Sequence, residues 1–168
     1  DGKLIRGSSL FDGRAAKAMR FGSAVHTVFE CIEWWDDEAK AKVELLCESE
    51  PEAVEAVEKC LQTKEIAAFF QNDGDGAAVW RERAFELVME GEICSGVFDR
   101  VIVREGHAEV IDFKTDRVEG EEDLAEAVEW HRGQLEWYRR VLIQLTGLPE
   151  AQITCRLLFT HPRRVVTL

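Results

Sequence analysis

Hydrophobic and polar positions alternate along residues 108–115, which is typical of a β-strand. Ile111 and Phe113 are predicted to point into a core. Side chains two apart in a strand point to the same face, so Asp112 and Lys114 lie side by side on the opposite face. Charges on a buried strand are costly unless they are paired or bind a metal. This strand is therefore predicted to carry a site.

Two more strands are predicted upstream, over residues 77–89 and 92–103, and the second of them carries Asp99. A short turn at residues 104–107 leads from the second strand into the third. Gly106 in this turn can adopt the positive φ that tight hairpin loops need. The three strands are therefore predicted to form an antiparallel meander. If the two aspartates face each other in it, they can share a divalent cation.

Apolar residues recur at helical spacing in the remaining segments. Ser49 is a candidate cap for one of these helices, with Pro51 in its first turn, and Gly147 with Pro149 ends another. The predicted helices are residues 21–35, 36–48, 49–70 and 121–146, the last with a candidate break at 129–131. Residues 153–160 are predicted as a fourth strand and 165–168 as a candidate fifth strand at an edge.

These elements predict an α/β (α+β) fold, a central mixed sheet of four to five strands flanked by helices. A chain of 168 residues is expected to be one domain, with a mainly helical part at 1–76 and a core at 77–168. The composition is 46% hydrophobic and 32% charged, as in globular proteins. No apolar run approaches the length of a membrane span. Because the sequence starts with Asp1 and not Met, we expect a domain excised from a longer chain.

The charge balance weakens any prediction of nucleic-acid binding. The formal net charge is -12, from 21 basic and 33 acidic residues, whereas phosphate contacts usually need clustered Lys and Arg. If the chain acts on DNA, most of its affinity is expected to come from another domain. Five cysteines, an odd number with no C-x-x-C pair, predict reduced thiols in a cytoplasmic protein.

Five short motifs follow one another from about Phe21 to the end of the chain. They are G-S-A-V-H with His26, W-R-E-R-A-F with Glu82, G-V-F-D-R with Asp99, I-D-F-K-T-D with Asp112 and Lys114, and Q-L-E-W-Y with Gln134 and Tyr138. In this order they together resemble the PD-(D/E)xK nuclease superfamily and most closely its RecB/AddA-like branch. One departure is Ala84, which stands where the first-strand E-x-P-F motif has proline.

The resemblance implies a restriction-endonuclease-like core and a Mg²⁺- or Mn²⁺-dependent deoxyribonuclease, an exonuclease in preference to an endonuclease. It implies metal ligands from Asp99, Asp112, His26 and the backbone carbonyl of Phe113, with Lys114 orienting the attacking water. Glu82, Gln134 and Tyr138 are expected to support the site or position substrate. The alternatives are an ordinary helix histidine at His26, a strand glutamate at Glu82 paired with Arg81 or Arg100, a core Tyr138 and a surface Gln134.

The resemblance also implies DNA as the partner, together with helicase domains or another component of a complex for double-strand break repair and recombination. Some relatives hold an iron–sulfur cluster on one upstream cysteine and a trio near the C-terminus. Here only Cys155 follows Tyr138, so no cluster is expected. No membrane partner is expected. The alternatives are a free-standing exonuclease of the same family and a catalytically silent domain that threads DNA or contacts another protein.

Overall fold

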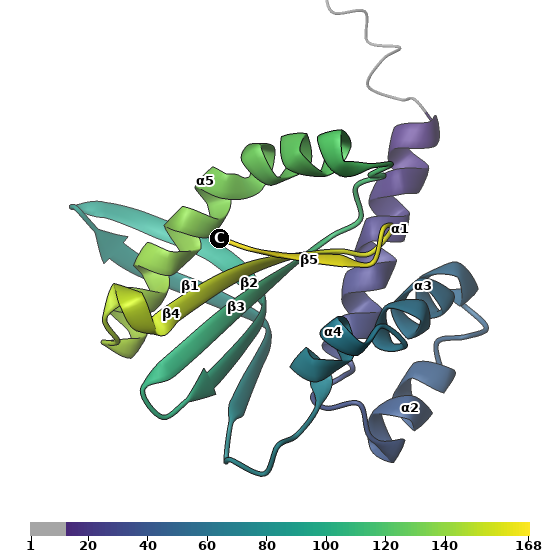
Figure 1. The fold of residues 1–168 in the computed structure, drawn as a ribbon, viewed down its shortest axis with the longest axis horizontal. Helices are drawn as coiled ribbons and strands as arrows, with labels where there is room; N and C mark the ends of the chain where they lie inside the picture. The colour runs from purple at the N-terminus through teal and green to yellow at the C-terminus, as the bar shows by residue number, and fades with distance from the viewer. Residues whose placement is uncertain (1–12) are drawn as a thin grey trace, which may run out of the picture.

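The computed structural model describes residues 13–168 as helices packed around one sheet (Figure 1). The helices are α1 (Gly13–Glu30), α2 (Asp37–Glu44), α3 (Pro51–Leu61), α4 (Lys64–Ala67) and α5 (Glu121–Thr146), with short 3₁₀ turns η2 (Ala68–Phe70) and η3 (Glu150–Gln152). The strands are β1 (Ala78–Met89), β2 (Glu92–Arg104), β3 (His107–Lys114), β4 (Ile153–Phe159) and β5 (Arg164–Thr167). No helix in the described part of the chain is long and apolar enough to cross a membrane.

The five strands lie in the order β1-β2-β3-β4-β5. Strands β1, β2 and β3 pair antiparallel, which confirms the predicted meander, and Gly106 in the β2–β3 turn has a φ of 71°. β3 and β4 pair parallel, so the chain must cross over between them, and α5 makes this connection. β5 pairs antiparallel with β4 at the edge. The predicted mixed sheet is therefore confirmed.

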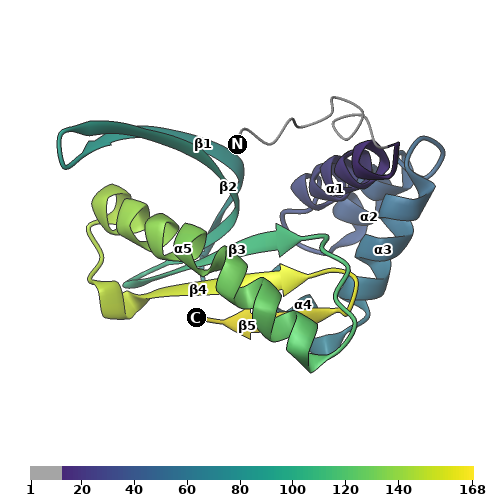
Figure 2. The ribbon, with the colours of Figure 1, turned by 90° about the horizontal axis from the view of Figure 1, so that it is seen from above.

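The sheet separates two hydrophobic cores, because neighbouring residues of each strand face opposite sides. Ile111 and Phe113 of β3 pack against α1 to α4, whereas Val110 belongs to the core under α5. In β4, Leu158 belongs to the core beside α1 to α4, and Leu157 belongs to the core under α5. Figure 2 shows α5 along one face and the bundle of α1 to α4 beside the other. Asp112 and Lys114 therefore lie on the α5 side of β3.

Several predicted helix boundaries were wrong. α2 ends at Glu44, four residues before the predicted end. α1 begins at Gly13 and ends at Glu30, earlier at both ends than the predicted helix. The predicted helix 49–70 is divided at residues 62–63, where the chain turns so that α4 and η2 bring Ile66 and Phe70 into the core of α3.

Ser49 does not cap α3. Glu50 occupies the cap position without a side-chain hydrogen bond, and Pro51 starts the helix. α5 is one continuous helix, so the candidate break at 129–131 is wrong, although its axis bends (Figure 1). Gly147, with a φ of 71°, ends it as predicted.

Candidate active site

The ladder between β1 and β2 is interrupted at one position. Arg81 pairs with Arg100 and Arg83 pairs with Phe98, whereas Glu82 lies between these pairs without joining the ladder. Glu82 has a φ of 43°, a left-handed conformation that is unfavourable for a residue with a side chain. Local strain of this kind persists where the surrounding structure enforces it, and it is often found at functional sites.

Asp99 of β2 lies at the centre of the site. Its Oδ2 accepts a hydrogen bond of 2.8 Å from the backbone N–H of Phe113, which fixes the carboxylate against β3. The same oxygen lies 3.1 Å from Nε2 of His26 on α1. Burial alone would raise the pKa of Asp99, but hydrogen bonds from His26, Asp112 and the Phe113 backbone outweigh it and lower the pKa. Asp99 is therefore ionised at neutral pH.

Asp112 of β3 is buried beside Asp99, with only 3% of the residue exposed. Burial and then the charge of Asp99 raise the pKa of Asp112 to about 7. Nζ of Lys114 lies 2.8 Å from Oδ2 of Asp112, yet this buried oxygen receives no well-directed hydrogen bond. Two carboxyl groups that share a buried site do not ionise independently, and here Asp112 is the one whose pKa is raised.

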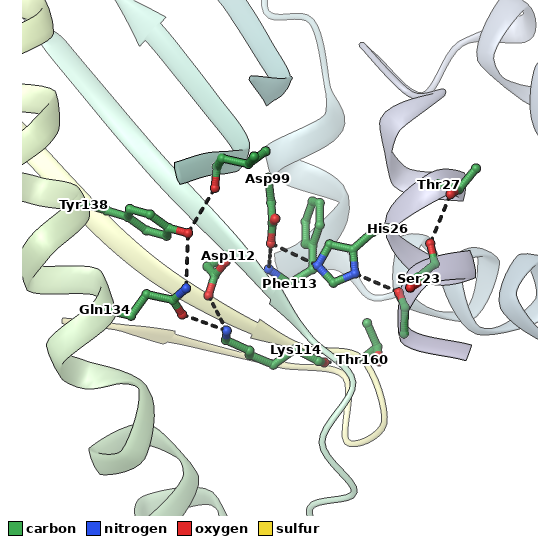
Figure 3. A network of polar contacts seen from close by, with 12 residues as sticks. Ser23, His26, Thr27, Asp99, Asp112, Phe113, Lys114, Gln134, Tyr138 and Thr160 are labelled. Atoms are coloured by element: carbon green, nitrogen blue, oxygen red, sulfur yellow. Dashed lines mark hydrogen bonds and ion pairs between the residues drawn. The ribbon is translucent and has the colours of Figure 1, made fainter. Parts of the chain in front are cut away.

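A chain of hydrogen bonds runs from Lys114 into α5 (Figure 3). Nζ of Lys114 donates to Oε1 of Gln134 at 2.9 Å. Nε2 of Gln134 donates to the hydroxyl of Tyr138 at 3.1 Å, and this hydroxyl donates to the carbonyl of Val97 at 3.0 Å. Tyr138 is buried, and this burial raises its pKa. The chain holds the lysine amine beside Asp112.

His26 approaches the carboxylates from the opposite side, on α1 (Figure 3). Its Nδ1 lies 2.7 Å from the carbonyl of Gly22, so Nδ1 is the donor in this contact. The hydrogen bond to Asp99 raises the pKa of His26 to about 9, against the effect of burial. A Cβ at Gly22 would lie 3.0 Å from Oγ1 of Thr115, so glycine allows α1 to approach the end of β3 closely.

The donor atoms of His26, Glu82 and Asp99 lie within 4.8 Å of one another. Burial, and then the charge of Asp99, raise the pKa of Glu82 to about 7, and its Oε1 is buried without a hydrogen-bond partner. Carboxylate oxygens of Glu82 and Asp99 beside an imidazole, with the buried Oε1 of Glu82 free of a hydrogen-bond partner, fit a hard divalent cation, Mg²⁺ or Mn²⁺. A cleft of about 780 Å³, lined by His26 and Glu82, opens beside them toward Asp116.

The structure thus brings the seven candidate side chains around one point, His26 and Glu82 on one side of the aspartates and Lys114, Gln134 and Tyr138 on the other. The alternative in which Glu82 pairs with Arg81 or Arg100 is wrong. Arg81 donates to the carbonyl of Glu30 at 2.7 Å, and Arg100 points to the other face of the sheet. Tyr138 is in part the core residue of the alternative prediction, because it packs against Phe98.

Sequence reasoning considered Arg100 only as a partner of Glu82 and missed its buried role, and it missed the pairing of Asp116 with His131. The side chain of Arg100 is fully buried and donates to the carbonyls of Ile32, Glu33 and Phe69 at 2.7, 2.6 and 3.0 Å. The signal was the strand period, since a residue next to Asp99 must face the opposite side. Asp116 Oδ2 lies 2.8 Å from Nε2 of His131, a contact between distant segments that no local pattern predicts.

Comparison with known proteins gives the same family. Subunits of ATP-dependent helicase/nucleases are 38% identical to this chain over 76 residues in Limosilactobacillus fermentum and 27% identical over 154 residues in Streptococcus sanguinis. These matches cover 44% and 83% of this chain. A third such subunit, from Enterococcus faecalis, is 27% identical over 172 residues and covers 87% of the chain.

The chain spans only 6 to 14% of the length of these relatives. The family model of the PD-(D/E)XK nuclease superfamily matches residues 4–166, almost the whole chain. The match and these relatives confirm the RecB/AddA-like resemblance. The chain belongs to the PD-(D/E)XK nuclease superfamily.

Proposed function

We propose that this domain is a deoxyribonuclease that hydrolyses phosphodiester bonds with the help of Mg²⁺ or Mn²⁺. The observation that carries the proposal is the convergence of Asp99, Asp112 and Lys114 at one point, beside a buried oxygen of Glu82 that has no hydrogen-bond partner. Asp99, Asp112, His26 and the backbone carbonyl of Phe113 would hold the cation, and Glu82 is close enough to join them.

When bound, a divalent cation supplies charge neutralisation at the phosphate and lowers the pKa of coordinated water. The contribution of the chain itself is to position groups around the scissile phosphate. The ammonium of Lys114 would orient the attacking water and stabilise charge on the phosphate oxygens. Gln134 accepts a hydrogen bond from Lys114 and is itself held by Tyr138, so both would keep the amine in place. Glu82 would support the ligands or accept a proton.

We further propose that the domain works with a helicase on DNA ends, in double-strand break repair and recombination in the cytoplasm. The names of the relatives as helicase/nuclease subunits support this. A domain with a formal net charge of -12 gains little affinity for DNA from attraction to phosphate, and a motor that delivers the strand would compensate for this. Exonuclease action on the delivered end is the mode we favour.

Digestion of linear single- and double-stranded DNA, with and without Mg²⁺, tests the proposal directly. Circular DNA in the same assay separates cleavage at ends from internal cleavage. Asp112→Ala and Lys114→Ala are expected to lower the rate by at least about a hundredfold, as removal of one group that stabilises charge typically does. Asp75→Ala changes an exposed carboxylate outside the site and should leave the rate unchanged.

Cleavage by Lys114→Ala at the wild-type rate would refute the mechanism. If the wild-type protein bound the cation but cleaved none of the substrates, the alternative of a catalytically silent domain would be favoured.

A further inference from the structure

Trp130 on α5 is 83% exposed and is the one aromatic residue among the large exposed hydrophobic side chains of the described part of the chain. An exposed indole has a free face for a flat ligand. Residues four apart on a helix share a face, so Trp130 lies one turn from Gln134, whose side chain contacts Lys114. The exposed indole is therefore a neighbour of the candidate active site.

Gly133 continues this face between Trp130 and Trp137. A glycine inside a helix lowers helix stability relative to alanine. A Cβ at Gly133 would meet no atom within 4 Å, so packing within the described protein does not require glycine there. Gly133 leaves open space on the helix surface beside Gln134. We call the face formed by Trp130, Gly133, Gln134 and Trp137 the α5 platform.

We propose that the α5 platform binds single-stranded DNA, with one unpaired base stacked on Trp130 and the strand passing over Gly133 toward Lys114. This inference rests on the proposed nuclease function, which supplies the class of ligand. The platform is continuous with the site through the hydrogen bond between Gln134 and Lys114. Bases inside a duplex are already stacked on each other, so the platform selects single strands.

The charge of the protein leaves stacking as the main source of affinity for a single strand. Arg132, the cation nearest to Trp130 along α5, is paired with Glu129 at 2.8 Å, and the formal net charge is -12. Electrostatic attraction to phosphate is therefore weak. Base–aromatic stacking does not depend on this attraction and contributes to single-strand binding without sequence preference.

Binding of a labelled single-stranded oligonucleotide with cleavage-resistant phosphorothioate linkages, followed by fluorescence anisotropy in Mg²⁺, tests the platform. Trp130→Ala is expected to weaken binding about tenfold, the usual effect of losing one base–aromatic stack, whereas Trp130→Phe should retain most of it. Gly133→Leu places a side chain in the open space without a clash and should weaken binding as well. Leu145→Ala, also exposed on α5 but several turns away, is the matched control and should bind like wild type.

An oligonucleotide with an abasic position at the stacked base adds a readout that a structural role would not change. Wild type should lose affinity for it about as much as Trp130→Ala loses for the intact strand, and Trp130→Ala should not distinguish the two. Equal binding by wild type and Trp130→Ala, or no single-strand binding by wild type, would overturn the platform. Cleavage assays test the nuclease function separately from the platform. If the platform bound single strands but no cleavage occurred, only the proposed nuclease function would be refuted.

Discussion

Replacing Asp112 with asparagine is expected to stabilise the metal-free protein at alkaline pH. Burial and the charge of Asp99 raise the pKa of Asp112 from 3.8 to about 7. Over this interval the folded protein keeps a proton on Asp112 that the unfolded chain has released. The stability that this proton contributes is fully present below the unfolded pKa and is lost as the pH rises through the folded pKa. Asparagine carries no charge, so the variant avoids this loss.

The shift from 3.8 to about 7 corresponds to at most about 4 kcal/mol, since one pKa unit is worth about 1.4 kcal/mol. The variant also loses the ion pair at 2.8 Å between Asp112 and Lys114, which offsets part of the gain. We therefore expect a net stabilisation of about 2 to 4 kcal/mol at about pH 8. In a chain of 168 residues this raises the unfolding midpoint by roughly 5 to 15 °C.

Thermal and urea unfolding in the presence of a chelator, at about pH 5 and about pH 8, measures the effect. The stability advantage of the variant should be smaller at the lower pH, where the pH has risen only part of the way from the unfolded pKa of 3.8 to the folded pKa of about 7, and larger at the higher pH. Asp75→Asn is the matched control. A hydrogen bond from Arg104 lowers the pKa of Asp75. The effect of Asp75 on stability therefore changes with pH in the opposite direction, and replacing Asp75 cannot stabilise the protein at high pH.

Adding Mg²⁺ or Mn²⁺ should stabilise the wild type, by about 2.7 kcal/mol at a hundred times the dissociation constant, and should affect the Asp112→Asn variant far less. If the variant in chelator were less stable than the wild type at both pH values, Asp112 would be a structural partner of Lys114. The reasoning that this carboxylate is held at a cost until a cation binds would then be refuted.

Three further predictions follow from the same geometry. Lys114→Ala should lose cleavage but keep cation binding, measured by calorimetry. Loss of both cleavage and cation binding would contradict the proposal that Lys114 is not among the residues that hold the cation. Cation affinity should rise between about pH 6 and pH 9. The reason is that the pKa values of His26 and Asp112 are about 9 and about 7, and both groups must release protons to bind the cation. Calorimetry in two buffers of different ionisation enthalpy measures the number of protons released. Arg100→Met should destabilise the protein by roughly 3 kcal/mol in urea unfolding, because three carbonyls lose a buried donor, whereas Arg140→Met at an exposed ion pair should change stability by less than about 1 kcal/mol.

The sheet could be predicted from the sequence because its order follows from local signals. The strand period placed Ile111 and Asp112 on opposite faces, and a glycine turn joined β2 to β3, which is the pairing observed. The parallel pairing of β3 with β4 is consistent with the long helix between them. The β1–β3 meander thus follows from short-range signals, whereas the place of β4 beside β3 depends on a pairing between distant segments.

The helix boundaries could not be predicted in the same way. Residues 13–20 of α1 are exposed, so no apolar stripe marks that part of the helix. The division of 49–70 into α3, α4 and η2 depends on tertiary packing, since Ile66 and Phe70 reach the same core only after a turn at 62–63. This turn is favoured by contacts with residues that are far away in the sequence, and a local sequence pattern carries no information about such contacts.

The candidate site was predicted by residue type and spacing, but its strain was not. The positive φ of Glu82, its unpartnered Oε1 and the raised pKa of Asp112 appear only when the strands are assembled. Each feature is unfavourable in the metal-free protein. Departures from local rules that gather at one point, in a chain that otherwise follows them, are typical of a site built for a ligand.

The two neighbouring residues Asp99 and Arg100 show how the fold holds this arrangement. Their side chains leave β2 on opposite faces, one to the candidate ligands and the other to the backbone that follows α1. Arg100 binds the carbonyls of Ile32 and Glu33, just beyond the end of the helix that carries His26. One strand thus positions a carboxylate and, through a buried arginine outside the site, also binds the backbone that follows the helix carrying His26.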